Sequence, residues 1–268
     1  MTSLLFLIVA RATSGHTNPA RIPREVFQSP FWKGFGGRTD RPLIAISTPL
    51  FFRSADGFVR NSRINFAEDL PFQRQLLPKG FSWPLWDSWV NIRNIQAASQ
   101  VSNVFAALHT EPVMESARRV SLDKLRGRAA LFLGHPRGAA TLADLLSALN
   151  FYVDRSSPGQ SLDGFSNRAP RTNELPHYQR SGGETLHNLN LSGSDYGLIT
   201  LIQNEGSHIL SLFGDYCDTP YFLVQRLTNP DFVRWLQALI FGPSVPAFQY
   251  CQVVLRIRYL NSEPLEAE

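Results

Sequence analysis

The chain has few of the residues that define several protein classes. Its 268 residues include only two cysteines, Cys217 and Cys251, which excludes a disulfide-stapled scaffold and a structural zinc site built from Cys ligands. Charged residues make up only 18% of the chain and hydrophobic residues 43%, so an intrinsically disordered protein is excluded as well. What remains is a globular protein with a sizeable core, in one large domain or two small ones.

Lysine is scarce, and arginine carries most of the positive charge. The first 128 residues hold 17 basic and 9 acidic side chains, whereas the remaining residues hold 9 basic and 13 acidic ones. The basic residues are scattered and nowhere form a run of five. Because phosphate binding needs positive charge clustered on one face, we expect no nucleic acid partner for this chain.

No apolar run is long enough to cross a membrane. Residues 4–10 are apolar, but a transmembrane helix needs about 20 such residues, and no basic side chain precedes this run as in a signal peptide. Three interpretations stay open: a degenerate export signal, the tail of a membrane helix from a longer ancestor, or a buried first segment. We expect residues 1–30 to be an apolar segment and linker outside the core of a soluble domain, and association with a membrane through this segment stays an open alternative.

Short apolar runs alternate with helical patterns along the chain. Near-continuous apolarity predicts buried strands at residues 42–49 and 129–133, and apolar residues at helical spacing predict helices over 91–108 and 141–149. A turn at 204–207 between two apolar runs predicts a hairpin. Further elements are expected at 113–120, 121–126, 151–153, 195–202, 208–213, 221–227, 231–240 and 253–260. This order predicts an α/β fold, a Rossmann-like three-layer sandwich with a largely parallel sheet and one antiparallel hairpin.

Two stretches interrupt this order. Residues 50–90 are rich in aromatic rings, arginine and proline, and residues 154–194 are polar and rich in turns. We interpret both as irregular insertions in a single domain over 31–268, and the second as an excursion that adds nothing to the core.

The candidate ligand sites are two junctions between a strand and a helix, each beginning with a glycine, at residues 134–138 and 214–219. Ligands of open parallel sheets bind beyond the carboxyl ends of the strands, where these junctions lie. Backbone amides there favour anions, and an arginine at the first junction adds hydrogen-bond donors. Ordinary turn chemistry explains the glycines equally well. The candidate ligand-binding residues are Gly134, His135, Arg137, Gly138, Gly214, Asp215, Asp218 and Thr219, the last also a candidate helix cap before Pro220.

Familiar catalytic and metal-binding patterns are missing. The junctions lack the Gly-Lys-hydroxyl ending of a phosphate-binding loop and the Gly-x-Gly-x-x-Gly spacing of a dinucleotide fingerprint, and no Gly-x-Ser-x-Gly elbow occurs. His135, Asp215 and Asp218 are the only clustered metal-ligand candidates, and no paired-histidine motif accompanies them. We therefore expect no metal, no cofactor and no catalytic residue, and we expect both cysteines to be free thiols.

Several motifs, in order along the chain, resemble one bacterial domain family. They are Phe31-Trp32 with the run 42–46, the helix and strand at 121–126 and 129–134, the strand 195–200, Leu212-Phe213-Gly214 and the strand 252–255. Over residues 31–260 the chain resembles the C-terminal, sensor-like domain of acidobacterial winged-helix proteins, which are often membrane-anchored. The chain departs from the family's Asn-rich turn at 135–138 and from its Gly-Thr-x-Ala-Ala helix start at 218–222, and no winged helix is present.

Three functional hypotheses follow. The first is a non-catalytic domain of a signalling-type protein that binds a small molecule or an anion, as the resemblance and the two junctions imply. The second is an enzyme of hydrolase or glycosyl-transfer type that uses Asp215 or Asp218. The third is a degenerate structural or interaction domain, which the altered loops favour.

Overall fold

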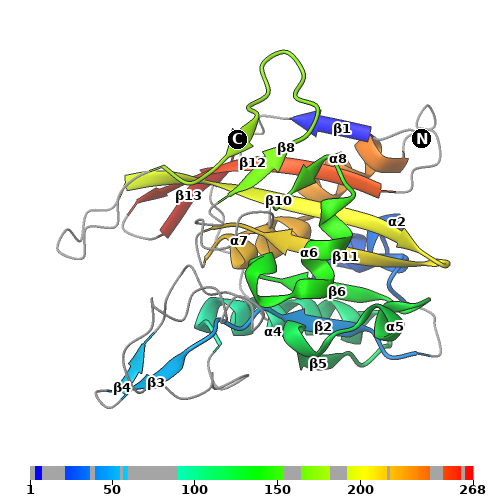
Figure 1. Ribbon diagram of the computed structural model, residues 1–268. Helices are drawn as coiled ribbons and strands as arrows, with labels where there is room; N and C mark the ends of the chain where they lie inside the picture. Colours follow the sequence, from blue (N-terminus) through cyan, green and yellow to red (C-terminus); the bar gives the residue numbers. More distant parts are fainter. Residues whose placement is uncertain are drawn as a thin grey trace.

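An eight-stranded sheet organises the molecule (Figure 1). The computed structural model describes residues 4–7, 22–36, 40–54, 57–59, 90–153, 164–181, 192–215, 218–241, 250–260 and 263–267. Along the sheet the strand order is β1-β12-β10-β11-β6-β2-β5, and β13 pairs with β12 beyond this path. The strands of this sheet are β1 (Leu4–Leu7), β2 (Leu43–Ile46), β5 (Val113–Ser116), β6 (Ala130–Leu133), β10 (Ser192–Asn204), β11 (Ser207–Phe213), β12 (Tyr250–Leu260) and β13 (Glu263–Ala267).

The sheet combines a parallel part with antiparallel neighbours. Strands β5, β2, β6 and β11 run parallel to one another, and β1 runs parallel to β12. Strand β10 is antiparallel to both β11 and β12, and the β10–β11 pair is the hairpin predicted around residues 204–207. Helices cover both faces, so the protein is a three-layer α/β fold with a mostly parallel sheet, as the sequence predicts.

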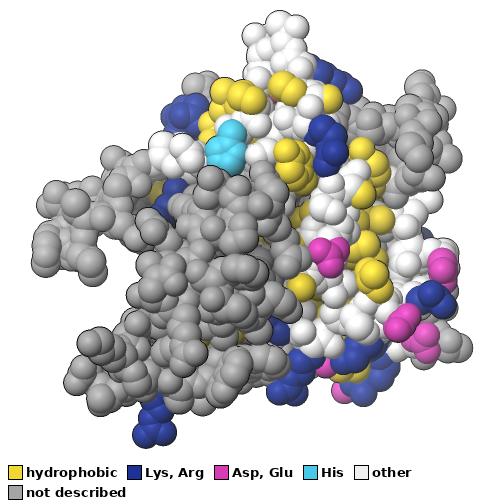
Figure 2. Space-filling model, in the orientation of Figure 1, with side chains coloured by type: hydrophobic (Ala, Val, Ile, Leu, Met, Phe, Trp, Pro, Cys, Tyr) yellow, Lys and Arg dark blue, Asp and Glu magenta, His cyan; other side chains and the backbone are white. Residues whose placement is uncertain are grey.

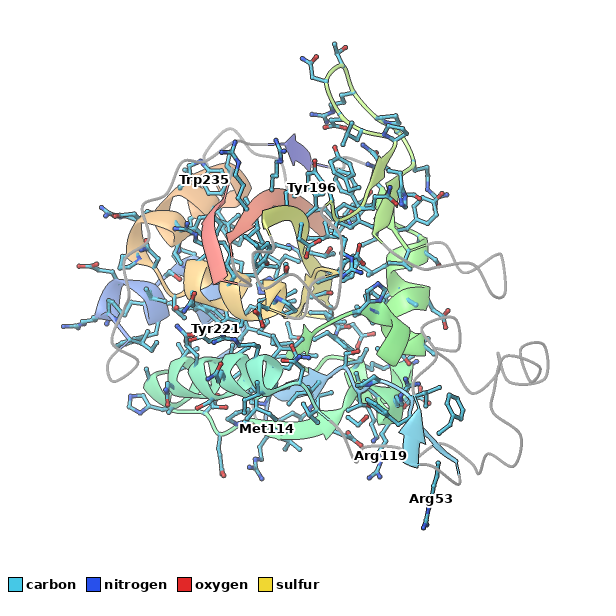
Figure 3. The ribbon with its side chains drawn as sticks, turned by 90° about the vertical axis from the view of Figure 1, so that its left-hand side faces the viewer. Arg53, Met114, Arg119, Tyr196, Tyr221 and Trp235 are labelled. Carbon is cyan, nitrogen blue, oxygen red and sulfur yellow. The ribbon has the colours of Figure 1, made fainter. Side chains whose placement is uncertain are left out.

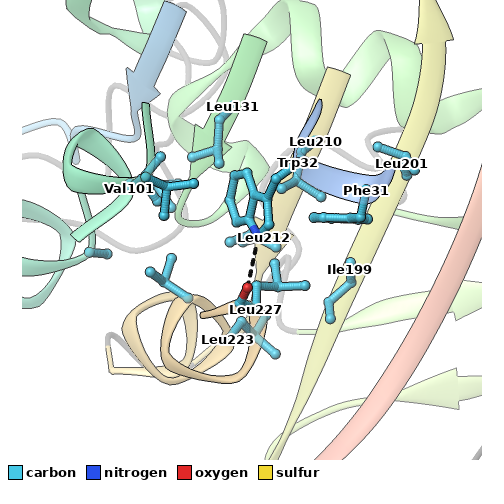
Figure 4. Packing of buried hydrophobic residues seen from close by; sticks show 14 of the residues in the cluster. Phe31, Trp32, Val101, Leu131, Ile199, Leu201, Leu210, Leu212, Leu223 and Leu227 are labelled. Carbon is cyan, nitrogen blue, oxygen red and sulfur yellow. Dashed lines mark hydrogen bonds between the residues drawn. The ribbon is translucent and has the colours of Figure 1, made fainter. Parts of the chain in front are cut away.

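Most helices cover one face of the sheet. They are α1 (Arg24–Phe27), α2 (Pro30–Lys33), α4 (Ile92–Ala107), α7 (Thr219–Leu227) and α8 (Pro230–Phe241). Trp32 lies at the centre of this layer, fully buried, and its indole N–H donates to the carbonyl of Leu227 at 2.8 Å (Figure 4). The hydrogen bond satisfies the polar end of the ring and ties α2 to the end of α7.

The opposite face is covered by short helices and a small sheet. The helices are α5 (Leu122–Leu125) and α6 (Ala140–Ser147), with short 3-10 turns η3 (Ala117–Arg119) and η4 (Pro136–Gly138) nearby. The small sheet comprises β7 (Phe151–Tyr152), β8 (Phe165–Asn167) and β9 (His177–Tyr178), and a separate hairpin comprises β3 (Phe52–Ser54) and β4 (Gly57–Val59). Alternate side chains of the central strands point to opposite faces of the sheet: Ile44 packs against the first helical layer and Ala45 against the second.

The structure corrects the interpretation of residues 154–194 as an excursion outside the core. Phe165 and Tyr178 are almost fully buried and stack with their rings 5.2 Å apart, against Phe213 of the main sheet. These residues belong to the second layer. Strands of two or three residues are long enough to place large aromatic rings in the core, and such rings bury a large apolar area.

The first thirty residues contribute more to the fold than an appended segment would. The backbone of β1 forms a parallel ladder with β12, from Leu4 opposite Cys251 to Leu7 opposite Val254. Val26 of α1 is fully buried among the helices of the first layer. Part of the expected linker therefore belongs to the core, so the expectation that the domain begins after residue 30 is corrected. In the described part of the chain, no helix is long and apolar enough to span a bilayer.

Candidate functional site

The two predicted junctions lie on the same edge of the sheet. Strands β2, β6 and β11 are parallel neighbours, so the residues that follow them emerge together. The backbone N–H of Gly134 donates to the carbonyl of Leu212 at 3.1 Å, and the N–H of Ser47 donates to that of Leu133 at 2.8 Å. Figure 3 faces this edge, with Tyr196 on the first part of β10 and Tyr221 on α7. The predicted placement of both junctions at one edge is confirmed.

Gly134 and Gly138 are required by packing within the protein. A Cβ atom on Gly138 would lie 2.2 Å from Oγ of Ser47, and one on Gly134 would lie 2.8 Å from the Cβ of Ser47. Gly134 also has a φ of +101°, which side chains disfavour. Ser47 in turn donates from its hydroxyl to the carbonyl of His135 at 2.7 Å. The absent side chains thus make room for the loop after β2.

Gly214 makes room for Thr219 in the same way. A Cβ atom at Gly214 would lie 2.1 Å from Cγ2 of Thr219. The Thr219 hydroxyl donates to the carboxylate of Asp195 and lies 2.6 Å from the phenol oxygen of Tyr259. The three side chains are at most 7% exposed. The N-cap position of α7 is Asp218, whose side chain makes no capping bond, so the expectation that Thr219 caps this helix is wrong, although Pro220 does lie in its first turn.

His135 and Asp215 bring the two junctions together. Nε2 of His135 lies 3.3 Å from Oδ1 of Asp215, and the Asp215 side chain is only 3% exposed. The edge of the imidazole meets Phe213 with the ring centres 4.5 Å apart. The histidine side chain is 14% exposed, so it is the more accessible member of the pair. A carboxylate behind a histidine orients the imidazole ring.

An ion pair at the same edge joins α4 to α7. Nε of Arg93 lies 3.3 Å from Oδ1 of Asp218, and the guanidinium also lies over the ring of Tyr221, 5.5 Å from its centre. Arg93 is 28% exposed, whereas Asp218 is 9% exposed. The carboxylate was a sequence candidate, but Arg93 was not. The predicted helix over 91–108 placed it in a first turn, yet no motif distinguished it from other surface arginines.

Asn94 is another side chain that sequence motifs did not indicate. It follows Arg93 in α4, is 7% exposed, and has its Nδ2 atom 3.1 Å from where a Cβ of Gly134 would lie. Its Oδ1 atom is buried and accepts no hydrogen bond from the residues that the structure describes. A buried acceptor without a donor is costly, and such atoms in native proteins commonly bind water or a ligand.

Two of the predicted features lie outside the described residues. The side chain of Arg137 and all of Cys217 are among them, so the structure does not test Arg137 as an anion anchor or Cys217 as a free thiol. Cys251 is a free, buried thiol. Within the described ranges, no three His, Cys, Asp or Glu side chains gather as a metal ion requires.

Basic side chains at the β5 and α5 end of the sheet are interleaved with acidic ones. Lys and Arg side chains gather along the lower rim of the face in Figure 2. Lys124 pairs with Glu115 at 2.6 Å, and Arg41 pairs with Glu111 at 3.1 Å. Opposite charges in contact weaken the field that would attract a polyanion.

Comparison of the chain with protein-family models, with curated proteins and with solved structures gives no match.

Proposed function

We propose that this protein is a non-catalytic domain that binds a small polar molecule at the carboxyl edge of its sheet. The observation that carries the proposal is the convergence there of two side-chain pairs, His135–Asp215 and Arg93–Asp218, from separate segments of the chain. In each pair the His135 or Arg93 side chain is more exposed than the carboxylate. These partly exposed side chains can present N–H groups to a ligand, while the carboxylates hold them in position.

Binding is favoured over catalysis because the hydroxyl groups at this edge already have structural partners. Ser47 donates to a backbone carbonyl, Thr48 lies 3.0 Å from the hydroxyl of Ser116, and Thr219 bonds to Asp195. A nucleophilic hydroxyl needs a neighbouring base within hydrogen-bond reach, and in these three hydrogen bonds no hydroxyl donates to the imidazole of His135.

A sensor role follows from the position of Arg93. This residue links α4 to Asp218, directly ahead of α7, and both helices belong to one layer. A ligand that binds the guanidinium in place of Asp218 would break the ion pair between α4 and α7. The packing of the two helices could then differ between the free and the bound protein, which is what a sensor requires. The resemblance to the sensor-like domain of acidobacterial proteins supports the same role.

The experiment is a ligand-observed NMR screen with probes that span the polar classes: myo-inositol, D-ribose, L-glutamate, putrescine and inorganic phosphate. We expect saturation transfer to at least one probe, and a loss of about tenfold in affinity in His135→Gln and Arg93→Gln, since each variant removes the side chain that a carboxylate holds toward the ligand. His177→Gln and Arg234→Gln are matched controls, because both residues are exposed and lie elsewhere. Absence of binding by every probe, or equal losses in the control variants, would contradict the proposal.

The His135–Asp215 pair specifically favours a second candidate, an enzyme of hydrolase or glycosyl-transfer type. A carboxylate that orients a histidine is the arrangement of a general base. Hydrolysis of p-nitrophenyl acetate or of p-nitrophenyl glycosides by the wild-type protein, with loss of turnover in both His135→Gln and Asp215→Asn, would establish this candidate instead. Turnover that survives both substitutions, or no turnover, speaks against it.

A further inference from the structure

The carbonyl oxygen of the Asn94 side chain is a polar atom of the candidate site whose hydrogen bonding is incomplete. It is buried, and no described residue donates to it. Its neighbours are already engaged: the Ser47 hydroxyl donates to the carbonyl of His135, and the Arg93 guanidinium contacts Asp218 and Gln96. Within the part of the chain that the structure describes, no further donor lies beside Asn94, and a water molecule or a ligand hydroxyl would supply the missing hydrogen bond.

The charges around Asn94 favour neither an anion nor a cation. Asp215 and Asp218 lie at this edge with Asp195 buried behind them, which opposes an anion. The N-terminal ends of α4 and α7 also meet here, and their partial positive charge opposes a cation. A neutral group that both donates and accepts hydrogen bonds suits the surroundings better than either.

A hydroxyl group is such a neutral group. It can donate to Oδ1 of Asn94 and accept from an N–H group of the partly exposed Arg93 or His135 side chain. Several hydroxyls on one small molecule would engage these residues together, because they come from neighbouring segments of the same edge: Asn94 contacts the Gly134 position, and Gly134 precedes His135.

We propose that the ligand is a small neutral polyhydroxy molecule, a polyol or a sugar, and that one of its hydroxyls donates to Oδ1 of Asn94. This inference rests on the proposed function and specifies the ligand class of the same site. It assigns Asn94 as a ligand-binding residue that positions the molecule between the start of α4 and the loop after β6.

The test is saturation-transfer NMR with myo-inositol, sorbitol, D-glucose and D-ribose, compared with inorganic phosphate and putrescine. Thermal shift is unsuitable as the readout, because polyols stabilise proteins by being excluded from their surfaces. The key variant is Asn94→Leu, which keeps the size of the side chain and removes its polar atoms. Asn103→Leu is the matched control, since Asn103 lies on the same helix and is exposed. Asn94→Ala replaces the leucine variant if the latter does not give a folded NMR spectrum.

We expect at least one polyhydroxy probe to bind, with binding weakened about tenfold in Asn94→Leu and unchanged in Asn103→Leu. Asn94→Asp, which keeps an acceptor at the same place, should retain binding. If no polyhydroxy probe binds, and phosphate or putrescine binds in a way that His135→Gln weakens, the proposed ligand class is wrong and the proposed function stands. Equal binding by Asn94→Leu and wild type would show that Oδ1 is only hydrated. No binding by any probe would overturn both proposals.

Discussion

The side chain of Gln252, in β12, pairs with the backbone of Phe151, in β7, through two hydrogen bonds. The Phe151 N–H donates to Oε1 and Nε2 donates to the Phe151 carbonyl, each at 2.8 Å. Nε2 also reaches the hydroxyl of Thr200 at 3.3 Å. Gln252 is fully buried, and its amide takes the place of a strand partner on the edge of β7 that faces away from β8, which joins the small sheet to the main sheet.

Gln252→Leu should therefore destabilise the protein by about 2–5 kcal/mol, because it leaves a buried N–H and a buried carbonyl of Phe151 unpaired. The measurement is the free energy of unfolding in urea. Gln203→Leu, in the same sheet but exposed, is the control and should change stability little. Equal stability of the two variants would contradict the role of Gln252.

Gly214→Ala should cost about 1–3 kcal/mol, since the new Cβ would overlap the side chain of Thr219 and push it off Asp195 and Tyr259. Gly36→Ala is the control, because its Cβ would meet Leu108 at 3.5 Å, an ordinary contact. Thermal unfolding of both variants checks the prediction. Equal melting temperatures of Gly214→Ala and Gly36→Ala would contradict it.

The strands and helices of the parallel part could be predicted because their sequence signals are strong. The predicted helix over 91–108 is α4, and the predicted strand over 129–133 contains β6. Ser121 caps α5 as expected, with its hydroxyl accepting from the N–H of Lys124. In each case the signal is local, from apolar spacing or a capping residue.

The small sheet and much of the site could not be predicted, because they depend on contacts distant in sequence. A strand of two residues such as His177–Tyr178 has no periodicity to detect. The candidates His135 and Asp215 were found from their positions after strands, and the structure brings them together. Arg93 and Asn94 acquire their roles only when α4 packs beside the ends of β2 and β6, which no local pattern reports.

His208 should make the protein less stable in mild acid. Its ring packs 5.6 Å from that of Phe35 and lies against Gly34, and burial lowers the pKa of this histidine below its usual 6.5. The unfolded chain then binds the proton more readily, so stability is complete above pH 6.5 and is lost as the pH falls through the lowered pKa.

The measurement for His208 is the free energy of unfolding at several values between pH 7.5 and about pH 5. His208→Gln should remove part of the pH dependence, whereas His177→Gln, at an exposed histidine, should leave the slope close to that of the wild type. A slope that is the same in all three proteins would show that another group causes the loss.

Cys251 should resist alkylation in the folded protein. It is 2% exposed in β12, and burial raises the pKa of its thiol to about 12. Because only the thiolate reacts, its population at pH 8 falls about a thousandfold below that of an ordinary cysteine, in addition to the steric protection. We expect iodoacetamide to leave Cys251 unmodified under native conditions and to modify it in 8 M urea. Peptide mass spectrometry distinguishes the modification of Cys251 from that of Cys217.

Comparable rates of Cys251 modification in buffer and in urea would contradict this prediction. They would mean that β12 opens readily, and that the sheet between β1 and β10 is less stable than its buried side chains imply.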